Sequence, residues 1–267
     1  MRRLSISLLR QNKAVSTAIS ALIITAVTAT LVMAVAIYAY NVVEQQRGSA
    51  EFEVAKKSIL AFDDALQDAA WKLNASRAVR FKIEFGTLRL IPNAVTLNVT
   101  ATIGGSNYTL EYISTGLIRY STSTRYITFG ENYTSYVLGD SNLVVTDSTE
   151  SLSRVLVEQE PNFVNITLSY RTRAMRTSYL NVNGTMVNYV SVWLIRAVMS
   201  AASHYNSFDL KAKSLNIQTS TIDPGVNATS SCTINVASEN ESDSATISLD
   251  PGKVIFSVIV AEVQVSV

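Results

Sequence analysis

The sequence predicts an α+β protein. One long N-terminal helix, apolar and then amphipathic, is followed by an antiparallel β-sandwich-like head. Residues 14–43 form an uncharged, mostly apolar run, whereas residues beyond 76 alternate apolar and polar side chains in short segments separated by turns. We therefore divide the chain into a basic leader (1–13), a long helix (14–75) and a β-rich head (76–267).

The leader is strongly basic. It carries Arg2, Arg3, Arg10 and Lys13 and no acidic residue, while the rest of the chain has a small excess of acids. A basic segment before an apolar run is typical of the cytoplasmic flank of a membrane segment. The formal net charge of the chain is only +1, so nothing indicates a nucleic-acid partner.

The uncharged run predicts a helix of roughly 45 Å, longer than the roughly 30 Å hydrocarbon core of a bilayer. It is also too long for a secretory signal peptide, whose apolar region has about 7–15 residues. A helix that is apolar on all sides needs burial on every side, which lipid or a bundle of identical helices can supply. The large apolar residues expected to form this core are Ile19, Leu22, Ile23, Val27, Leu31, Val35 and Ile37.

The second half of the predicted helix carries its apolar residues on one face, spaced alternately three and four apart. We expect this face to pack on the head, and its members are Phe52, Ala55, Ile59, Phe62, Leu66, Ala69 and Leu73. Asp63, Asp64 and Asp68 lie off this stripe and are predicted to face solvent.

The head is predicted to contain 10 to 14 strands. Residues 79–85 alternate as a half-buried strand, and Gly86-Thr87 is interpreted as the turn after it. Gly104-Gly105 and Asn183-Gly184 are further turn signals. Residues 197–203 could form a strand or a helical turn. One large sandwich and two smaller stacked ones both remain open.

The junction before the apolar run reads Arg10-Gln11-Asn12-Lys13-Ala14-Val15-Ser16-Thr17. Together with the basic leader, the long helix and the β-rich head, it resembles the class III signal of archaeal type IV pilins and archaellins. This resemblance covers residues 10–75. It implies that a prepilin peptidase cleaves between Lys13 and Ala14, and that an assembly ATPase and a membrane platform protein drive polymerisation. Ala18 occupies the place where bacterial pilins carry a glutamate, which favours an archaeal subunit.

The resemblance implies a structural subunit of an extracellular archaeal type IV pilus-like filament that serves adhesion or motility. The subunit would stay in the cytoplasmic membrane before assembly and then form a helical homopolymer at the cell surface. Three alternatives remain: an uncleaved membrane anchor, a membrane-anchored or minor-pilin adhesin, and a hydrolase on a stalk. For the adhesin, Tyr126, Tyr133, Tyr136 and Tyr205 are the candidate binding aromatics.

The sequence contains eight Asn-x-Ser/Thr sequons after the apolar run. We expect at least two of them to carry sugar, because the head is expected to be extracellular. The sequons are at Asn74, Asn98, Asn107, Asn132, Asn165, Asn183, Asn227 and Asn240.

The residues that usually carry chemistry are few. Cys232 is the only cysteine, so it has no intramolecular partner, and its alternating surroundings predict a buried thiol. His204 is the only histidine and is predicted to lie in an exposed loop. We find no catalytic constellation, no metal-ligand spacing and no phosphate-binding loop, and therefore expect neither a cofactor nor enzyme activity.

Overall fold

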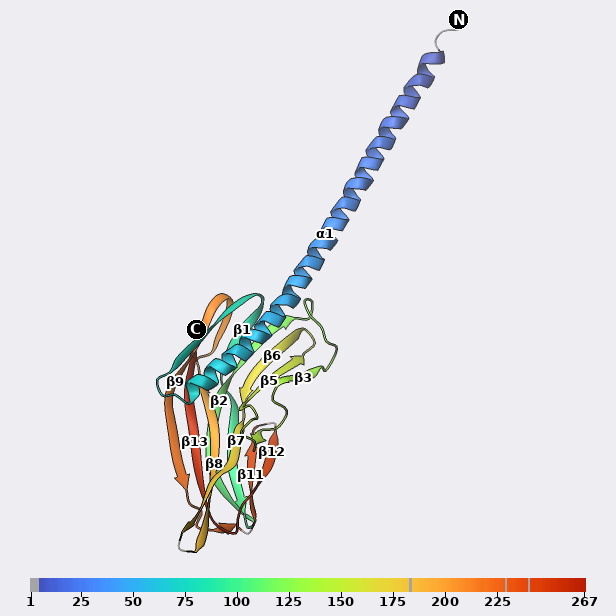
Figure 1. The fold of residues 1–267 in the computed structure, drawn as a ribbon. Coiled ribbons are helices and arrows are strands. Elements are labelled where there is room, and N and C mark those ends of the chain that lie inside the picture. The colour runs from blue at the N-terminus through green and yellow to red at the C-terminus, as the bar shows by residue number, and fades with distance from the viewer. Residues whose placement is uncertain (1–4, 183, 229, 240) are drawn as a thin grey trace. The chain divides into compact units, whose positions relative to one another are not determined.

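The computed structural model describes residues 5–182, 184–228, 230–239 and 241–267, with side chains from Thr17 onward except that of Val182. It consists of one helix followed by a large mixed sheet of 13 strands (Figure 1). The chain divides into two compact units, Met1–Arg47 and Gly48–Val267. The division falls inside the helix, so the amphipathic half of the helix belongs to the same unit as the sheet.

Helix α1 runs from Ser5 to Ala70. No proline interrupts this stretch, and the helical backbone continues without a break across residues 13 and 14. The helix ends five residues before the predicted boundary at residue 75. A turn follows in which Asn74 adopts a positive φ of 62°, a conformation that a continuing helix does not contain.

The strands follow the helix in a continuous series. Their bounds are β1 (Ser76–Ile103), β2 (Ser106–Ser123), β3 (Thr134–Leu138), β4 (Val144–Val145), β5 (Ser153–Gln159), β6 (Phe163–Tyr170), β7 (Thr172–Val182), β8 (Thr185–Val198), β9 (Ala202–Ile222), β10 (Asn227–Ala228), β11 (Ser231–Ala237), β12 (Ser242–Ser248) and β13 (Gly252–Ser266). The segment of residues 79–85, predicted as a half-buried strand, lies within β1.

The sheet is mixed, which corrects the expectation of an antiparallel one. The main path is β3-β5-β6-β2-β1-β9-β13-β8-β7-β4, and β11 joins it by pairing with β1 and with β12. Most neighbours are antiparallel, but β13 runs parallel to β8 and β4 runs parallel to β7. The long connection from β8 to β13 leaves their relative direction free, whereas a tight hairpin imposes an antiparallel pair.

Strand β1 passes through the position where a turn was predicted. Gly86 lies inside β1, next to a register shift between residues 83 and 88 in its pairing with β9. A Cβ on Gly86 would stand 2.4 Å from the ring of Tyr120. The glycine therefore provides space for an aromatic ring rather than a reversal of the chain. Residues 199–201, within the segment left open above, connect β8 to β9 and are neither helix nor strand.

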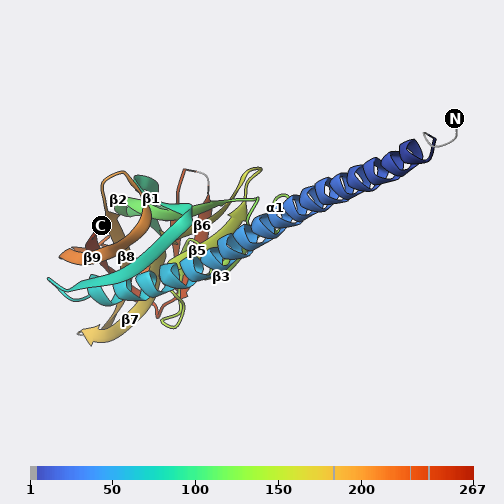
Figure 2. The same cartoon turned by 90° about the horizontal axis from the view of Figure 1, so that it is seen from above.

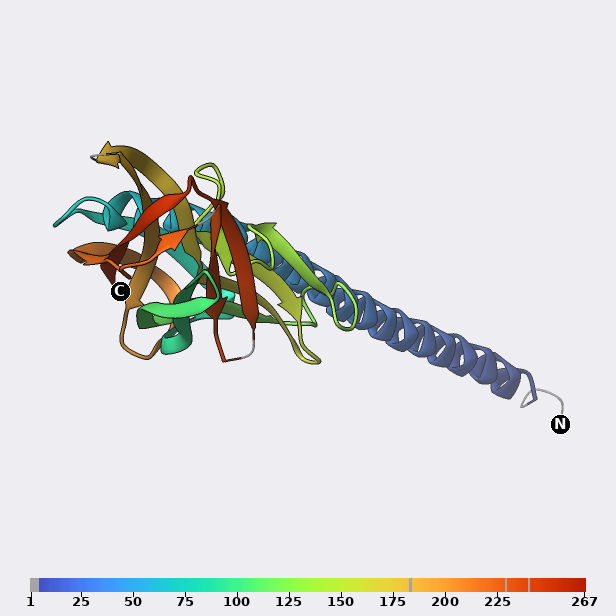
Figure 3. The same cartoon turned by 90° about the horizontal axis from the view of Figure 1, so that it is seen from below.

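The long strands carry two hydrophobic cores. The first core lies between the Gly48–Ala70 part of α1 and the sheet, and includes Phe52, Phe62, Phe81 and Tyr120 (Figure 2). The second core contains no helix residue and is closed by β11 and β12, which Figure 3 shows from below. Strand β1 contributes Phe81 to the first core and Val99 to the second, so both cores share one continuous strand.

Candidate functional site

The apolar half of α1 exposes its side chains in the structure. Helix Thr17–Ala70 is long and apolar enough to cross a membrane, with a mean hydropathy of 2.3 over its most apolar window, and none of that window is buried among the described residues. Val27, for example, is 54% exposed. The other six predicted core residues of this segment are exposed as well: Ile19, Leu22, Ile23, Leu31, Val35 and Ile37.

Three threonines in this segment satisfy their hydroxyl donors within the helix itself. The Oγ1 atoms of Thr25, Thr28 and Thr30 each donate a hydrogen bond to the carbonyl oxygen four residues earlier, at 2.9, 2.8 and 2.9 Å. Each hydroxyl is therefore satisfied within its own helix. The segment can enter an apolar environment without an unpaired hydroxyl donor at these three positions.

The amphipathic half of α1 packs on the sheet through its predicted stripe. Phe52, Ala55, Ile59, Phe62, Leu66 and Ala69 are all buried. The prediction for Leu73 is wrong, because Leu73 is 60% exposed. The helix ends at Ala70, so the helical spacing that would bring Leu73 onto the same face does not continue.

Glu51 fixes this half of the helix to β1. Its carboxylate accepts hydrogen bonds from the backbone N–H groups of Glu84 (2.6 Å), Phe85 (3.1 Å) and Gly86 (2.9 Å), and from the Tyr120 hydroxyl (3.0 Å). These N–H groups lie where the β1–β9 ladder is interrupted. Burial, together with the charge of Glu51, raises the pKa of Tyr120 above its usual range, so this hydroxyl stays protonated as a donor.

Sequence reasoning missed Glu51, because a glutamate on an amphipathic helix normally faces solvent. The sequence signal that corresponds to it is Gly86, because a glycine directly after an alternating run can mark an interruption of the strand ladder. Such an interruption leaves backbone donors that need acceptors from elsewhere in the fold.

Asp63 is fully buried, so its predicted position on the solvent-facing side of the helix is wrong. Its Oδ2 accepts hydrogen bonds from Ser153 Oγ (2.6 Å) and Gln67 Nε2 (2.8 Å), and its Oδ1 has no partner among the described residues. Burial raises the pKa of Asp63 to about 6, although the bonds from Ser153 and Gln67 act in the opposite direction. Burial, and to a smaller extent the charge of Asp63, also raises the pKa of Tyr170.

The aromatic candidates lie in three different places. Tyr126 and Tyr133 pack near the helix: Tyr126 contacts Phe85 with ring centroids 5.1 Å apart, and Tyr133 stacks on Phe129 at 4.6 Å. Tyr205 is exposed on β9. Tyr136 lines a cavity on the sheet.

Five sequons are accessible in the structure: Asn74, Asn98, Asn107, Asn132 and Asn227 have exposed side chains. Asn165 is only 2% exposed, and its Oδ1 accepts a hydrogen bond from Ser121 Oγ at 2.7 Å. The expectation of sugar at Asn165 is therefore wrong for the folded protein, since a buried amide cannot carry a glycan. Asn183 and Asn240 lie outside the described residues.

The remaining candidate residues lie in α1, β11 and β9. Lys13 and Ala14 lie in the helical backbone, and their side chains are outside the described ones. Cys232 is buried, as predicted, and burial raises the pKa of its thiol to about 11. His204 lies in β9 rather than in a loop, opposite Leu88 of β1 and against the ring of Phe208.

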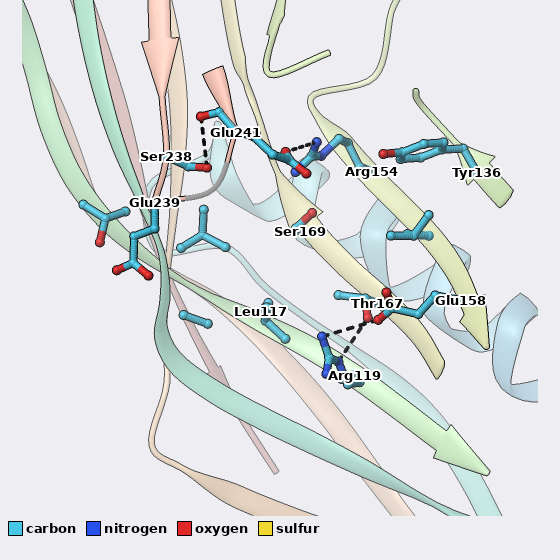
Figure 4. Close-up of a pocket in the computed structure, with 14 residues that line it drawn as sticks. Leu117, Arg119, Tyr136, Arg154, Glu158, Thr167, Ser169, Ser238, Glu239 and Glu241 are labelled. Atoms are coloured by element: carbon cyan, nitrogen blue, oxygen red, sulfur yellow. Dashed lines mark hydrogen bonds and ion pairs between the residues drawn. The ribbon is translucent and has the colours of Figure 1, made fainter. Parts of the chain in front are cut away.

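A cavity of about 340 Å³ lies on β3, β5, β6, β2 and β1, and residues of the β11–β12 connection form one of its walls. Its polar side chains include Arg119, Arg154, Glu158 and Glu241 (Figure 4). Arg154 Nη1 lies 3.0 Å from Glu241 Oε2, and Arg119 Nη2 lies 3.5 Å from Glu158 Oε1. The sequence did not indicate this cavity, because its residues come from six separate segments.

No protein-family model, curated protein or solved structure matches this chain. The structure therefore defines the architecture of the protein and assigns it to no family. A long apolar N-terminal helix precedes a sheet-rich domain, and this arrangement is compatible with that of a pilin.

Proposed function

We propose that this protein is a structural subunit of an extracellular archaeal type IV pilus-like filament, used for adhesion or motility. One observation carries the proposal. The apolar half of α1 is exposed on all sides, while the remainder of α1 is seated on a sheet-rich unit with its own cores. A chain built this way needs an apolar environment for one segment only.

Leaving the apolar side chains of that segment in water would cost a large amount of free energy. Burying one Leu, Ile or Val side chain contributes about 1.5–3 kcal/mol, and ten such residues are exposed in this segment. Their exposure to water would cost on the order of 10 kcal/mol, which is comparable to the stability of a whole domain. Lipid holds the segment before assembly, and identical helices hold it in the filament.

The transfer from lipid to a helical bundle exchanges one apolar environment for another, so its net driving force is small. Assembly then requires the partners that the signal resemblance implies: a prepilin peptidase that cleaves between Lys13 and Ala14, an assembly ATPase and a membrane platform protein. In this proposal the mature subunit lies at the cell surface and its precursor lies in the cytoplasmic membrane.

The test is electron microscopy of sheared surface fibres combined with N-terminal sequencing of their main component. The proposal expects fibres whose subunits begin at Ala14. Fibres made of another protein, or subunits that begin at Met1, would contradict it. A single-pass anchor would leave the protein in the membrane fraction after shearing.

An adhesin is the second candidate function. The cavity on β3, β5, β6, β2 and β1 favours it, because a purely structural head has no need of a polar concavity. The two functions are compatible in one filament subunit.

A further inference from the structure

The cavity is built by side chains in register on neighbouring strands. Arg119 of β2 lies opposite Thr167 of β6, Thr167 opposite Leu156 of β5, and Leu156 opposite Tyr136 of β3. Directly opposed residues point to the same face of a sheet. Four strands therefore present one row made of an arginine, a threonine, a leucine and a tyrosine, and Figure 4 shows Arg119, Thr167 and Tyr136 among the side chains that line the cavity.

The adjacent row supplies a buried cation with an unused donor. Arg154 lies opposite Ser169 and is only 8% exposed. Its Nη1 is held by Glu241 Oε2 at 3.0 Å and by the Ser141 carbonyl at 3.3 Å. Its Nε has no hydrogen-bond partner among the described residues. Arg154 is one of the residues that line the cavity, and an unsatisfied buried donor of this kind is commonly completed by a water molecule or a ligand.

The charges around the cavity are mixed. Arg119 and Arg154 supply fixed donors, whereas Glu158, Glu239 and Glu241 supply acceptors. Both arginines already face a glutamate, so neither a strong anion nor a strong cation is matched. A hydroxyl group is both donor and acceptor. A ligand with several neighbouring hydroxyls therefore fits this mixture of donors and acceptors.

The cavity is also apolar in part, since Val95, Leu117 and Leu156 contribute to its lining. A sugar ring has a C–H face that can lie on aliphatic side chains and hydroxyls at its edge that can reach the polar ones. Ligand cavities commonly measure about 300–1,000 Å³. At about 340 Å³, this cavity is suited to one or two sugar rings.

We propose that this cavity is a binding site for a neutral saccharide. Arg119, Arg154, Glu158 and Glu239 bind the ring hydroxyls, Leu117 and Leu156 contact its C–H face, and Tyr136 closes one side. The proposal does not depend on polymerisation, because every residue of the site belongs to the sheet-rich unit.

The experiment uses the full chain in micelles of a detergent without a sugar head group. The probes are glucose, galactose, mannose, N-acetylglucosamine and the β-1,4-linked disaccharides of glucose and N-acetylglucosamine. Binding is followed by saturation-transfer NMR and by calorimetric titration. We expect at least one probe to bind saturably in the millimolar range or tighter.

Two variants and two matched controls locate the site. Tyr136→Ala and Glu239→Gln are each expected to weaken binding about tenfold or more, while Tyr112→Ala and Glu131→Gln leave it unchanged. Tyr112 and Glu131 are exposed and do not line the cavity. Unfolding midpoints equal to that of the wild type show that the variants are folded. The proposal is overturned if no probe binds, or if the cavity variants bind as well as the controls.

The sugar could come from a foreign surface or from the subunit's own glycans, because the sequon at residue 240 stands in the sequence between Glu239 and Glu241, which both line the cavity. Protein made in a host without N-glycosylation is compared with the native glycoprotein. Probe binding to both forms assigns the site to a foreign saccharide. Binding only to the unglycosylated form shows that the native site holds a glycan of the protein itself.

Discussion

Glu51 provides the contact between α1 and β1 with the most hydrogen bonds. Three backbone N–H groups and one phenol hydroxyl converge on its carboxylate. Hydrogen bonds to a charged group contribute about 1.5–3 kcal/mol each to stability, and an unsatisfied buried donor costs about 1–3 kcal/mol. The contributions are not additive, so several kcal/mol in total is the expected scale.

We therefore expect Glu51→Ala to lower the free energy of unfolding of the sheet-rich unit by about 3 kcal/mol, as measured by urea titration. Glu53→Ala is the matched control. Glu53 lies two residues away on the same helix and pairs only with Lys56 at the surface, so its loss should cost less than about 1 kcal/mol. Equal losses in the two variants would show that Glu51 is not a special anchor.

Asp63 makes stability depend on pH. Its pKa is about 6 in the folded protein, against an ordinary value of 3.8. Below pH 4 the carboxyl is protonated in both states and its stabilising contribution is complete. Between about pH 4 and 6 the unfolded chain loses the proton first, so stability falls as pH rises. Above pH 6 the loss is complete, at about 2–3 kcal/mol.

Asp63→Asn should remove this dependence. Relative to the wild type, the variant should gain about 2–3 kcal/mol in the free energy of unfolding between pH 4 and pH 7. Glu131→Gln is the control, because Glu131 is an exposed carboxylate that does not contribute to the shift of Asp63, and its difference from the wild type should change much less with pH. A flat difference for both variants would mean that Asp63 titrates normally.

At the residue scale, sequence patterns predicted the buried stripe from Phe52 to Ala69 because the helix period is regular. They failed for Asp63 and Glu51, whose partners Ser153 and Gly86 are distant in sequence. Helical spacing alone places a carboxylate away from the stripe. Only the tertiary partners explain why these two are turned toward the sheet.

At the element scale, the two halves of α1 have different surroundings, and a lysine should distinguish them. Val27 lies in the apolar half, and Val54 lies in the seated half with 52% of its surface exposed. Val27→Lys should abolish fibres while the protein still inserts in the membrane, because one lysine costs a lone membrane helix only about 2.5–3.5 kcal/mol. In a fibre the same charge would recur in every subunit within a dry core.

Val54→Lys is the matched control, with the same substitution on the same helix, and it should still form fibres. Electron microscopy and membrane fractionation measure the two outcomes. Normal fibres from Val27→Lys subunits would exclude this helix as the fibre core and favour a membrane-anchored binding module.

The elements themselves were predictable to different degrees. The apolar and alternating segments have periods that identify a helix and strands, and Gly104-Gly105 marks the β1–β2 hairpin with positive φ at both residues. The parallel pairing of β8 with β13 and the row from Arg119 to Tyr136 depend on contacts between distant segments. Local periodicity contains no information on which strands become neighbours, so the cavity could not be predicted.

At the scale of the whole molecule, the division at Arg47 predicts that the sheet-rich unit folds independently. A truncation that removes residues 1–47 retains both hydrophobic cores. It should be soluble, monomeric, rich in β-structure by circular dichroism, and unable to form fibres. Aggregation, or loss of the cooperative unfolding transition, would show that the apolar half of α1 is required for folding.

Mass spectrometry of the native protein tests its extracellular placement. Sugar is expected on at least two sequons, chosen among the five exposed asparagines and the two at 183 and 240, but not at the buried Asn165. Sugar found at Asn165 would mean that glycosylation precedes folding. Unmodified peptides at all eight positions would remove the glycoprotein prediction and leave the filament proposal in place.

The hairpin made by α1 and β1 determines how the sheet-rich unit responds to mechanical tension. From Glu51 to Ala70 the helix covers roughly 30 Å, and from Ser76 to Gly86 the strand covers about the same length. The chain reverses at one end of this hairpin, and the Glu51 carboxylate closes the other. A force applied to the chain before Gly48 would therefore act on these hydrogen bonds before it acts on the buried stripe from Phe52 to Ala69. It would separate the helix from the sheet starting at that end. A fibre in flowing water would then owe part of its tensile strength to a single side chain.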